Sequence, residues 1–241
     1  MYHSITFGDK NTWDDWKLIP ETRPVFLPPD LKTNYVEVPG ADGVIDLSEA
    51  LTGEIKYKNR SGTINFFVMN GYKDWSERYS EIMDYLHGQS MRAVLEDDAG
   101  FYYEGRFSIN KWQSDKARSL IVIEYNISPY KIDMMSSAED WLWDPFDFDI
   151  GIIRDYSNVR INGTTTITMY GSRKTTIPEF IVTLDDDSKP IILSWSNLNN
   201  NTFSLKNGTN KLPDIKVKND ISTFTFKGQG IVSIDYRGGN L

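Results

Sequence analysis

Short runs of β-branched and aromatic residues, separated by turn-forming residues, recur along most of this 241-residue chain. In the first half of the chain these runs are 64–69, 91–95, 101–109 and 120–127. In the second half they are 164–170, 180–184, 191–195, 203–205, 223–226 and 231–236. Gly, Pro, Asn or Asp bound the runs, which is typical of β-strands joined by tight turns. The pattern predicts a mainly antiparallel β fold.

One segment departs from this pattern and predicts an α-helix. Its apolar residues follow one another at intervals of four, three, one and three, which places them on one helical face. They are Trp75, Tyr79, Ile82, Met83 and Leu86. Asp74 and Glu77 resemble a capping box at its start, and Gly88 suits the left-handed residue that ends a helix. A helix of about a dozen residues is marginal alone, so we expect it to pack across a sheet.

The distribution of charge predicts two domains and a connector. Residues 1–135 hold 15 Lys and Arg against 21 Asp and Glu, residues 136–150 hold none against five, and residues 151–241 hold 11 against eight. The aromatic residues of the middle segment are Trp141, Trp143, Phe146 and Phe148. Because a flexible linker is poor in aromatic residues, we expect a docked connector. The prediction is an α+β domain, the connector, and an antiparallel β-sandwich.

Composition excludes several classes of protein. The chain has no cysteine, which excludes disulfide scaffolds, zinc–thiolate sites, iron–sulfur clusters and a cysteine nucleophile. His3 and His87 are its two histidines, too few for a multi-histidine metal site. Uncharged stretches such as 61–71 are too short to span a membrane, and no signal peptide opens the chain, so we expect synthesis in the cytoplasm. A net charge of -8 disfavours general DNA binding.

Two acidic clusters are candidates for chemistry. Asp97 and Asp98 could form a glycosidase pair, but adjacent residues of a strand point to opposite faces, which favours a solvated hairpin tip. Asp185, Asp186 and Asp187 could bind calcium, but their spacing does not fit an EF-hand loop, which favours a turn.

The remaining motifs provide no group of residues that could act together in catalysis. His87 falls at the predicted end of the helix, where a capping or packing role is favoured over a catalytic one. No phosphate-binding loop, dinucleotide-binding motif or nucleophile elbow is present. We therefore expect a protein that is not an enzyme and that needs no cofactor and no metal.

One cluster suggests carbohydrate binding. Trp195, Asn197 and Asn199 could form a sugar-binding face, with an indole platform beside amide groups. The alternative is that the tryptophan lies in the core of a sandwich and that the asparagines form a turn. This cluster leaves open a lectin-like protein that binds cell-wall carbohydrate.

An ordered series of motifs resembles the distal tail proteins (Dit) of long, non-contractile-tailed phages and prophages of Gram-positive bacteria. The motifs are VPGADGVIDLSEALTG at 38–53, YKNR at 57–60, Phe66, Trp75, LHG at 86–88, LEDD at 95–98, Tyr103, GR at 105–106 and PYK at 129–131. Trp13 and Trp16 before Ile19-Pro20, and YRGGNL at 236–241, are also similar to that family.

The resemblance implies an N-terminal ring-forming domain, with a β-sandwich and a helix, and a C-terminal galectin-like sandwich. It implies a homohexameric ring in the virion, at the tail tip or baseplate, with a central channel for DNA. The partners implied are the tail tube protein, a hub or tail fibre protein, and receptor-binding proteins. We also hypothesise that Asp144, Asp147 and Asp149 face basic groups of the same or the next subunit.

Overall fold

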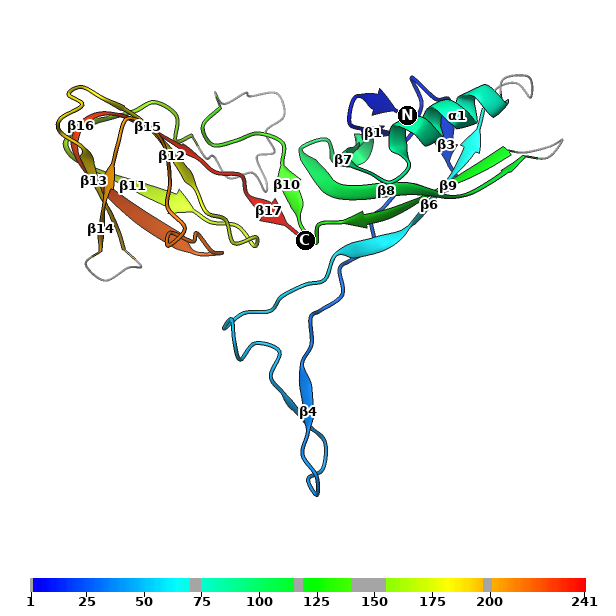
Figure 1. The fold of residues 1–241 in the computed structure, drawn as a ribbon, viewed down its shortest axis with the longest axis horizontal. Helices are drawn as coiled ribbons and strands as arrows, with labels where there is room; N and C mark the ends of the chain where they lie inside the picture. The colour runs from blue at the N-terminus through cyan, green and yellow to red at the C-terminus, as the bar shows by residue number, and fades with distance from the viewer. Residues whose placement is uncertain (1, 70–74, 115–118, 140–154, 197–200) are drawn as a thin grey trace. The chain divides into compact units, whose positions relative to one another are not determined.

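The computed structural model describes residues 2–69, 75–114, 119–139, 155–196 and 201–241. It divides the chain into two compact units, residues 1–131 with Leu241 (unit 1) and residues 132–240 (unit 2). Both units consist mainly of antiparallel strands, and α1 is the only α-helix among the described residues (Figure 1). The predicted mainly-β fold with one helix is confirmed.

The predicted limits of the two domains and of the connector stay predictions. Most of the connector, including Asp144, Asp147 and Asp149, falls in 140–154, outside the described residues. No helix in the described part of the chain is long and apolar enough to cross a membrane.

Unit 1 contains a curled antiparallel sheet in the order β2-β1-β7-β8-β9-β6-β3. Its strands are β1 (Ile5–Phe7), β2 (Lys10–Asn11), β3 (Leu18–Pro20), β6 (Arg60–Val68), β7 (Gln89–Leu95), β8 (Phe101–Ser114) and β9 (Ser119–Ile127). Apolar side chains alternate along β9, where Ile121, Ile123, Tyr125 and Ile127 are buried on one face. This alternation builds the apolar core on one side of the sheet.

The helix α1 (Trp75–Leu86) covers the core face of this sheet and contacts β8 (Figure 1). Ile82 and Leu86, both on the predicted apolar face, are fully buried. Gly88 has φ 74°, the left-handed conformation expected after the helix. Asp74, the predicted capping residue, lies outside the described residues.

Residues 28–59, which we call the arm, leave the sheet of unit 1 between β3 and β6 and extend away from it (Figure 1). The arm contains a two-stranded ribbon of β4 (Tyr35–Glu37) and β5 (Val44–Asp46). None of its residues is buried.

Unit 2 is organised around one long strand, β16, which pairs with β11 along one edge and with β12 and β13 along the other. β13 also pairs with β14, and β12 with β15. The strands are β11 (Val159–Tyr170), β12 (Glu179–Leu184), β13 (Ile191–Trp195), β14 (Thr202–Leu205), β15 (Gly208–Lys211) and β16 (Ile221–Asp235). Two short strands, β10 (Lys131–Asp133) and β17 (Gly239–Asn240), also pair with each other.

The sheet of unit 2 folds over on itself. Phe180 of β12 is in register with Ile234 of β16, yet its ring lies 5.7 Å from that of Phe224, ten residues earlier on the same strand. In a flat sheet ten residues span about 30 Å, so the two halves of β16 must face each other across the core. This packing agrees with the predicted sandwich.

The sequence predicts two strands, 223–226 and 231–236, with Gly228-Gln229-Gly230 as the turn between them. This turn is wrong, because β16 continues through these residues. Gly228 has φ 150° and Gly230 has φ 155°. A Cβ atom at Gly230 would lie 2.5 Å from the carbonyl oxygen of Thr183, so only glycine allows the strands to approach this closely. The glycines therefore bend the strand where its pairing changes from β13 to β12.

Candidate functional site

The arm carries half of the exposed large hydrophobic side chains found in the described residues. With the segment that leads into it, these are Val25, Leu27, Leu31, Tyr35, Val36, Val38, Val44, Ile45, Leu47, Leu51 and Ile55. Leu51 is 96% exposed. Single exposed apolar residues are ordinary, but a concentration of this size on one projecting ribbon is typical of a protein–protein contact.

The arm is also acidic. Residues 33–55 contain five carboxylates and no Lys, Arg or His. The carboxylates are Glu37, Asp42, Asp46, Glu49 and Glu54. Hydrogen bonds from the hydroxyl and the backbone N–H of Ser48 lower the pKa of Asp46, which keeps it charged. A surface that fits the arm must therefore be apolar, with positive or neutral polar groups around it.

Arg60 fixes the base of the arm. Its side chain is buried, and its guanidinium donates hydrogen bonds to the carbonyl oxygens of Phe26 (3.4 Å), Leu27 (3.2 Å) and Pro129 (2.8 Å). The ring of Tyr103 lies 5.5 Å from the guanidinium carbon. Burial lowers the pKa of Arg60, and no carboxylate among the described residues pairs with it.

Further contacts hold the two chain segments at the base of the arm. The backbone N–H of Leu27 donates to the hydroxyl of Tyr125 at 2.9 Å. The N–H of Lys32 donates to the carbonyl of Lys56, and the N–H of Lys58 to the carbonyl of Asp30, both at 2.8 Å. The base is thus fixed by backbone hydrogen bonds, whereas the ribbon beyond it is exposed.

Asp97 and Asp98 lie in the short 3₁₀ turn η2 (Glu96–Asp98), between the paired strands β7 and β8. The predicted hairpin is confirmed, but its tip is not simply solvated. Asp97 is 11% exposed and accepts hydrogen bonds from His3 and Arg23, while Asp98 pairs with Lys131 at 2.8 Å. The sequence could not show this, because the partners of Asp97 are 94 and 74 residues away along the chain.

His87, for which a capping or packing role is predicted, is exposed and hydrogen-bonds strand β8. It follows α1 directly, and its Nδ1 accepts a hydrogen bond from the backbone N–H of Ile109 at 3.1 Å. The register of β8 against β9 shifts between Ile109 and Lys111, so His87 satisfies a donor beside a β-bulge.

Asp185, Asp186 and Asp187 lie in a turn, as predicted. The guanidinium of Arg160 binds both carboxylate oxygens of Asp185, at 2.9 Å and 2.5 Å. The hydroxyl of Ser188 donates to Asp186 at 2.6 Å, and Lys189 pairs with the same carboxylate at 3.3 Å. In the described ranges no group of three His, Asp or Glu side chains is arranged to hold a metal ion.

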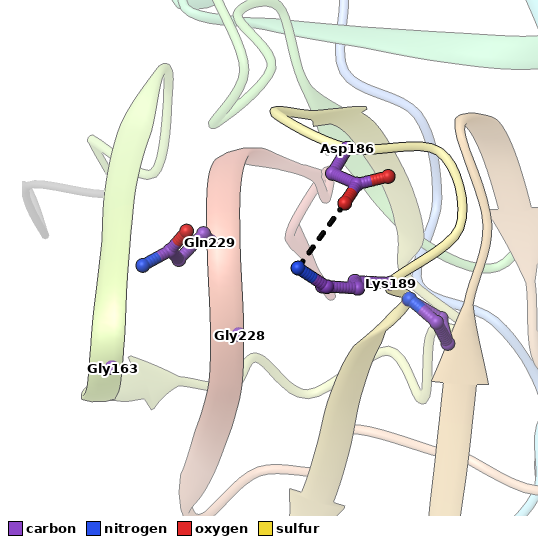
Figure 2. A pocket seen from close by; sticks show the side chains of 6 residues that line it. Gly163, Asp186, Lys189, Gly228 and Gln229 are labelled. Carbon is purple, nitrogen blue, oxygen red and sulfur yellow. Dashed lines mark ion pairs between the residues drawn. The ribbon is translucent and has the colours of Figure 1, made fainter.

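A pocket of about 280 Å³ lies beside this turn, at the bend of β16 (Figure 2). It is lined by Gly163, Asp186, Lys189, Pro190, Gly228 and Gln229. Figure 2 shows the ion pair of Asp186 and Lys189 beside the glycines of the two bent strands. Lys189 is 81% exposed and no aromatic ring lines the pocket, so it lacks the stacking platform typical of a sugar site.

The predicted sugar-binding residues fall partly outside the described chain. Trp195 is 7% exposed, and its ring stacks on Phe224 with an interplanar angle of 11°. Asn197 and Asn199 belong to residues 197–200, which are not described. Carbohydrate binding by these three residues stays a prediction.

Comparison with known proteins gives a likeness of fold. The sequence matches no family model, and it matches none of the curated proteins. The fold is similar to the crystal structure of SPP1 Dit (gp 19.1), described as a paradigm of the hub adsorption apparatus in phages that infect Gram-positive bacteria. The TM-score is 0.62 at 10% identity, over 97% of this chain and 98% of that chain. The two proteins therefore share a fold over nearly their whole lengths.

Proposed function

We propose that this protein is a structural component of a phage tail tip or baseplate and that it assembles into a homohexameric ring. The observation that carries the proposal is the projecting apolar arm, on a chain whose fold matches SPP1 Dit over nearly its whole length. The ring joins the tail tube protein to the hub or tail fibre protein and to receptor-binding proteins. In this role the protein is neither an enzyme nor a cofactor-binding protein, and it resides in the virion.

The arm supports a contact between copies because its apolar side chains are exposed and would be buried against a surface of another copy. A stable interface buries about 800 Å² on each partner, and the exposed apolar side chains of the arm would contribute to that area. When a protruding element of one copy binds a different surface of the next, the interface is heterologous, and such interfaces form a ring when the rotation between successive copies closes.

A ring of this kind encloses a channel for DNA. Residues 1–135 carry a net charge of -6, which disfavours retention of phosphates during passage. Double-stranded DNA should therefore show no tight binding to the assembled protein at physiological salt. Retention of DNA under those conditions would contradict the role of unit 1 as a channel wall.

Native mass spectrometry and negative-stain imaging test the ring. We expect hexamers from the unaltered chain and monomers from a variant with Val36, Ile45 and Leu51 all replaced by Ser. The matched control replaces the exposed Tyr170, Ile181 and Ile221 of unit 2 by Ser and should leave the hexamer intact.

Equal thermal unfolding of the two triple variants would show that any loss of the ring does not come from loss of the fold. A ring that persists in the arm variant would contradict the assigned contact. A monomeric unaltered protein that binds cell-wall polysaccharide would instead support the lectin-like alternative.

A further inference from the structure

The three consecutive carboxylates of η2 together bind three segments of unit 1. Glu96 holds the N-terminal segment, since its Oε2 accepts hydrogen bonds from the backbone N–H of Ser4 at 2.7 Å and from its hydroxyl at 3.0 Å. The backbone N–H of Glu96 in turn donates to the carbonyl of Ser4 at 3.0 Å. The turn and the start of β1 are therefore joined through both side chain and backbone.

Asp97 holds the segment that leads into the arm. Its Oδ2 lies 3.0 Å from Nε of Arg23, which stands between β3 and the arm, and 2.8 Å from Nδ1 of His3. The carboxylate is 11% exposed, whereas the Arg23 side chain is 66% exposed. Partial burial opposes the charge of Asp97, but hydrogen bonds from His3 and Arg23 outweigh it and lower the pKa of Asp97.

Asp98 holds the segment through which the chain leaves unit 1. Its Oδ2 lies 2.8 Å from Nζ of Lys131, the residue after which the chain enters unit 2. The same ammonium group lies 4.0 Å from the ring centroid of Phe101, at the start of β8. Lys131 is therefore fixed by a carboxylate and an aromatic ring that both belong to the β7–β8 hairpin.

Arg60 provides a second, independent link between the same two segments. It binds the carbonyls of Phe26 and Leu27 on the arm side and the carbonyl of Pro129 on the exit side. The segments 23–27 and 129–131 are thus connected once through η2 and once through Arg60, although they are about a hundred residues apart in the sequence.

We propose that η2 and Arg60 form a joint that couples the arm to the segment leaving unit 1, so that the two segments loosen or tighten together. Two groups held through a shared rigid element lose and gain order cooperatively, and this appears as a coupling free energy between them. Binding of any partner to the arm then changes the order of residues 129–131. The coupling belongs to the single chain and does not depend on the ring.

Amide hydrogen exchange of the full-length chain, measured at a concentration where it is monomeric, tests the joint. Arg23→Gln removes a contact on the arm side only. We expect exchange to rise in residues 23–31 and also in residues 130–133, which Arg23 does not touch. The change should be about twofold to fivefold, the factor that corresponds to a weak surface ion pair.

The reciprocal variant is Lys131→Gln, which should raise exchange in 23–27 by a similar factor. Lys189→Gln breaks the ion pair with Asp186 in unit 2 and serves as the control, with no change in either segment. An effect of each variant confined to its own segment would overturn the proposal. So would unfolding free energies of the single variants that add in the Arg23→Gln, Lys131→Gln double variant.

Discussion

Gly163 of β11 and Gly228 of β16 face each other in the pairing of the two longest strands of unit 2. Both have positive φ, 80° and 150° respectively. On one side of this pair β16 pairs with β13, and on the other it pairs with β12. The facing glycines therefore mark the corner at which the sheet turns to form two layers.

The first prediction concerns this corner. Gly228→Ala and Gly230→Ala should each destabilise the protein by about 1–3 kcal/mol, because a Cβ atom is strained at these φ values and meets close neighbours. At Gly228 that neighbour is Cγ1 of Ile191, at 2.9 Å. Urea unfolding measures the loss. Gly100→Ala is the control, since nothing lies within 4 Å of its Cβ position, and an equal loss there would refute the steric explanation.

The second prediction concerns the buried guanidinium of Arg60. Arg60→Met removes the donors to Leu27 and Pro129 and leaves their carbonyls without partners, which should cost about 1–3 kcal/mol. Arg60→Lys keeps one charged donor and should cost less. Lys58→Met, an exposed change at the same base of the arm, should stay within about 0.5 kcal/mol.

Urea midpoints compare these three variants. A smaller loss of unfolding free energy for Arg60→Met than for Arg60→Lys would contradict this prediction. It would show that the buried charge destabilises the fold and that its hydrogen bonds do not stabilise the base of the arm.

The third prediction is a dependence of stability on pH. The pKa of Asp97 is lower in the folded chain than its ordinary value of 3.8, so the folded state binds fewer protons than the unfolded state. This contribution is fully present above about pH 5 and is lost as the pH falls below the ordinary value of 3.8 and through the folded pKa. Asp15 and Asp186 have lowered pKa values and act in the same direction.

Thermal unfolding between pH 3 and pH 7 measures this effect. Asp97→Asn should flatten the curve on its acid side, while replacement of the exposed Asp42 by Asn should leave its shape unchanged. If Asp97→Asn loses stability in acid as steeply as the unaltered chain, Asp97 does not contribute to the pH dependence.

The sequence predicted local structure well and distant contacts poorly, for a physical reason. The helix at 75–86 was visible because the period of its apolar residues is a property of neighbouring residues. The roles of Asp97 and Arg60 were not visible, because their partners lie far away in the chain. The error at 228–230 arose because glycine serves both as a turn residue and as a point of close backbone approach.

The sequence does not predict the exposed arm, for a related reason. Its apolar residues look like those of any strand, and the sequence does not show whether a second layer covers them. The signal that could have found it is the absence of basic residues from 33–55, since an acidic ribbon with unpaired apolar side chains needs a complementary surface.

The central position of β16 also sets the order in which unit 2 can be built during synthesis. Its partners β11, β12 and β13 all precede it, and Tyr170 pairs with Ile221, 51 residues later. Until residues 221–235 leave the ribosome, the preceding strands lack their shared neighbour, and their apolar faces are open to chaperones and to other nascent chains. In unit 1 most of the paired strands have been synthesised once the chain reaches residue 127. Unit 1 can therefore fold before the central strand of unit 2 has been synthesised.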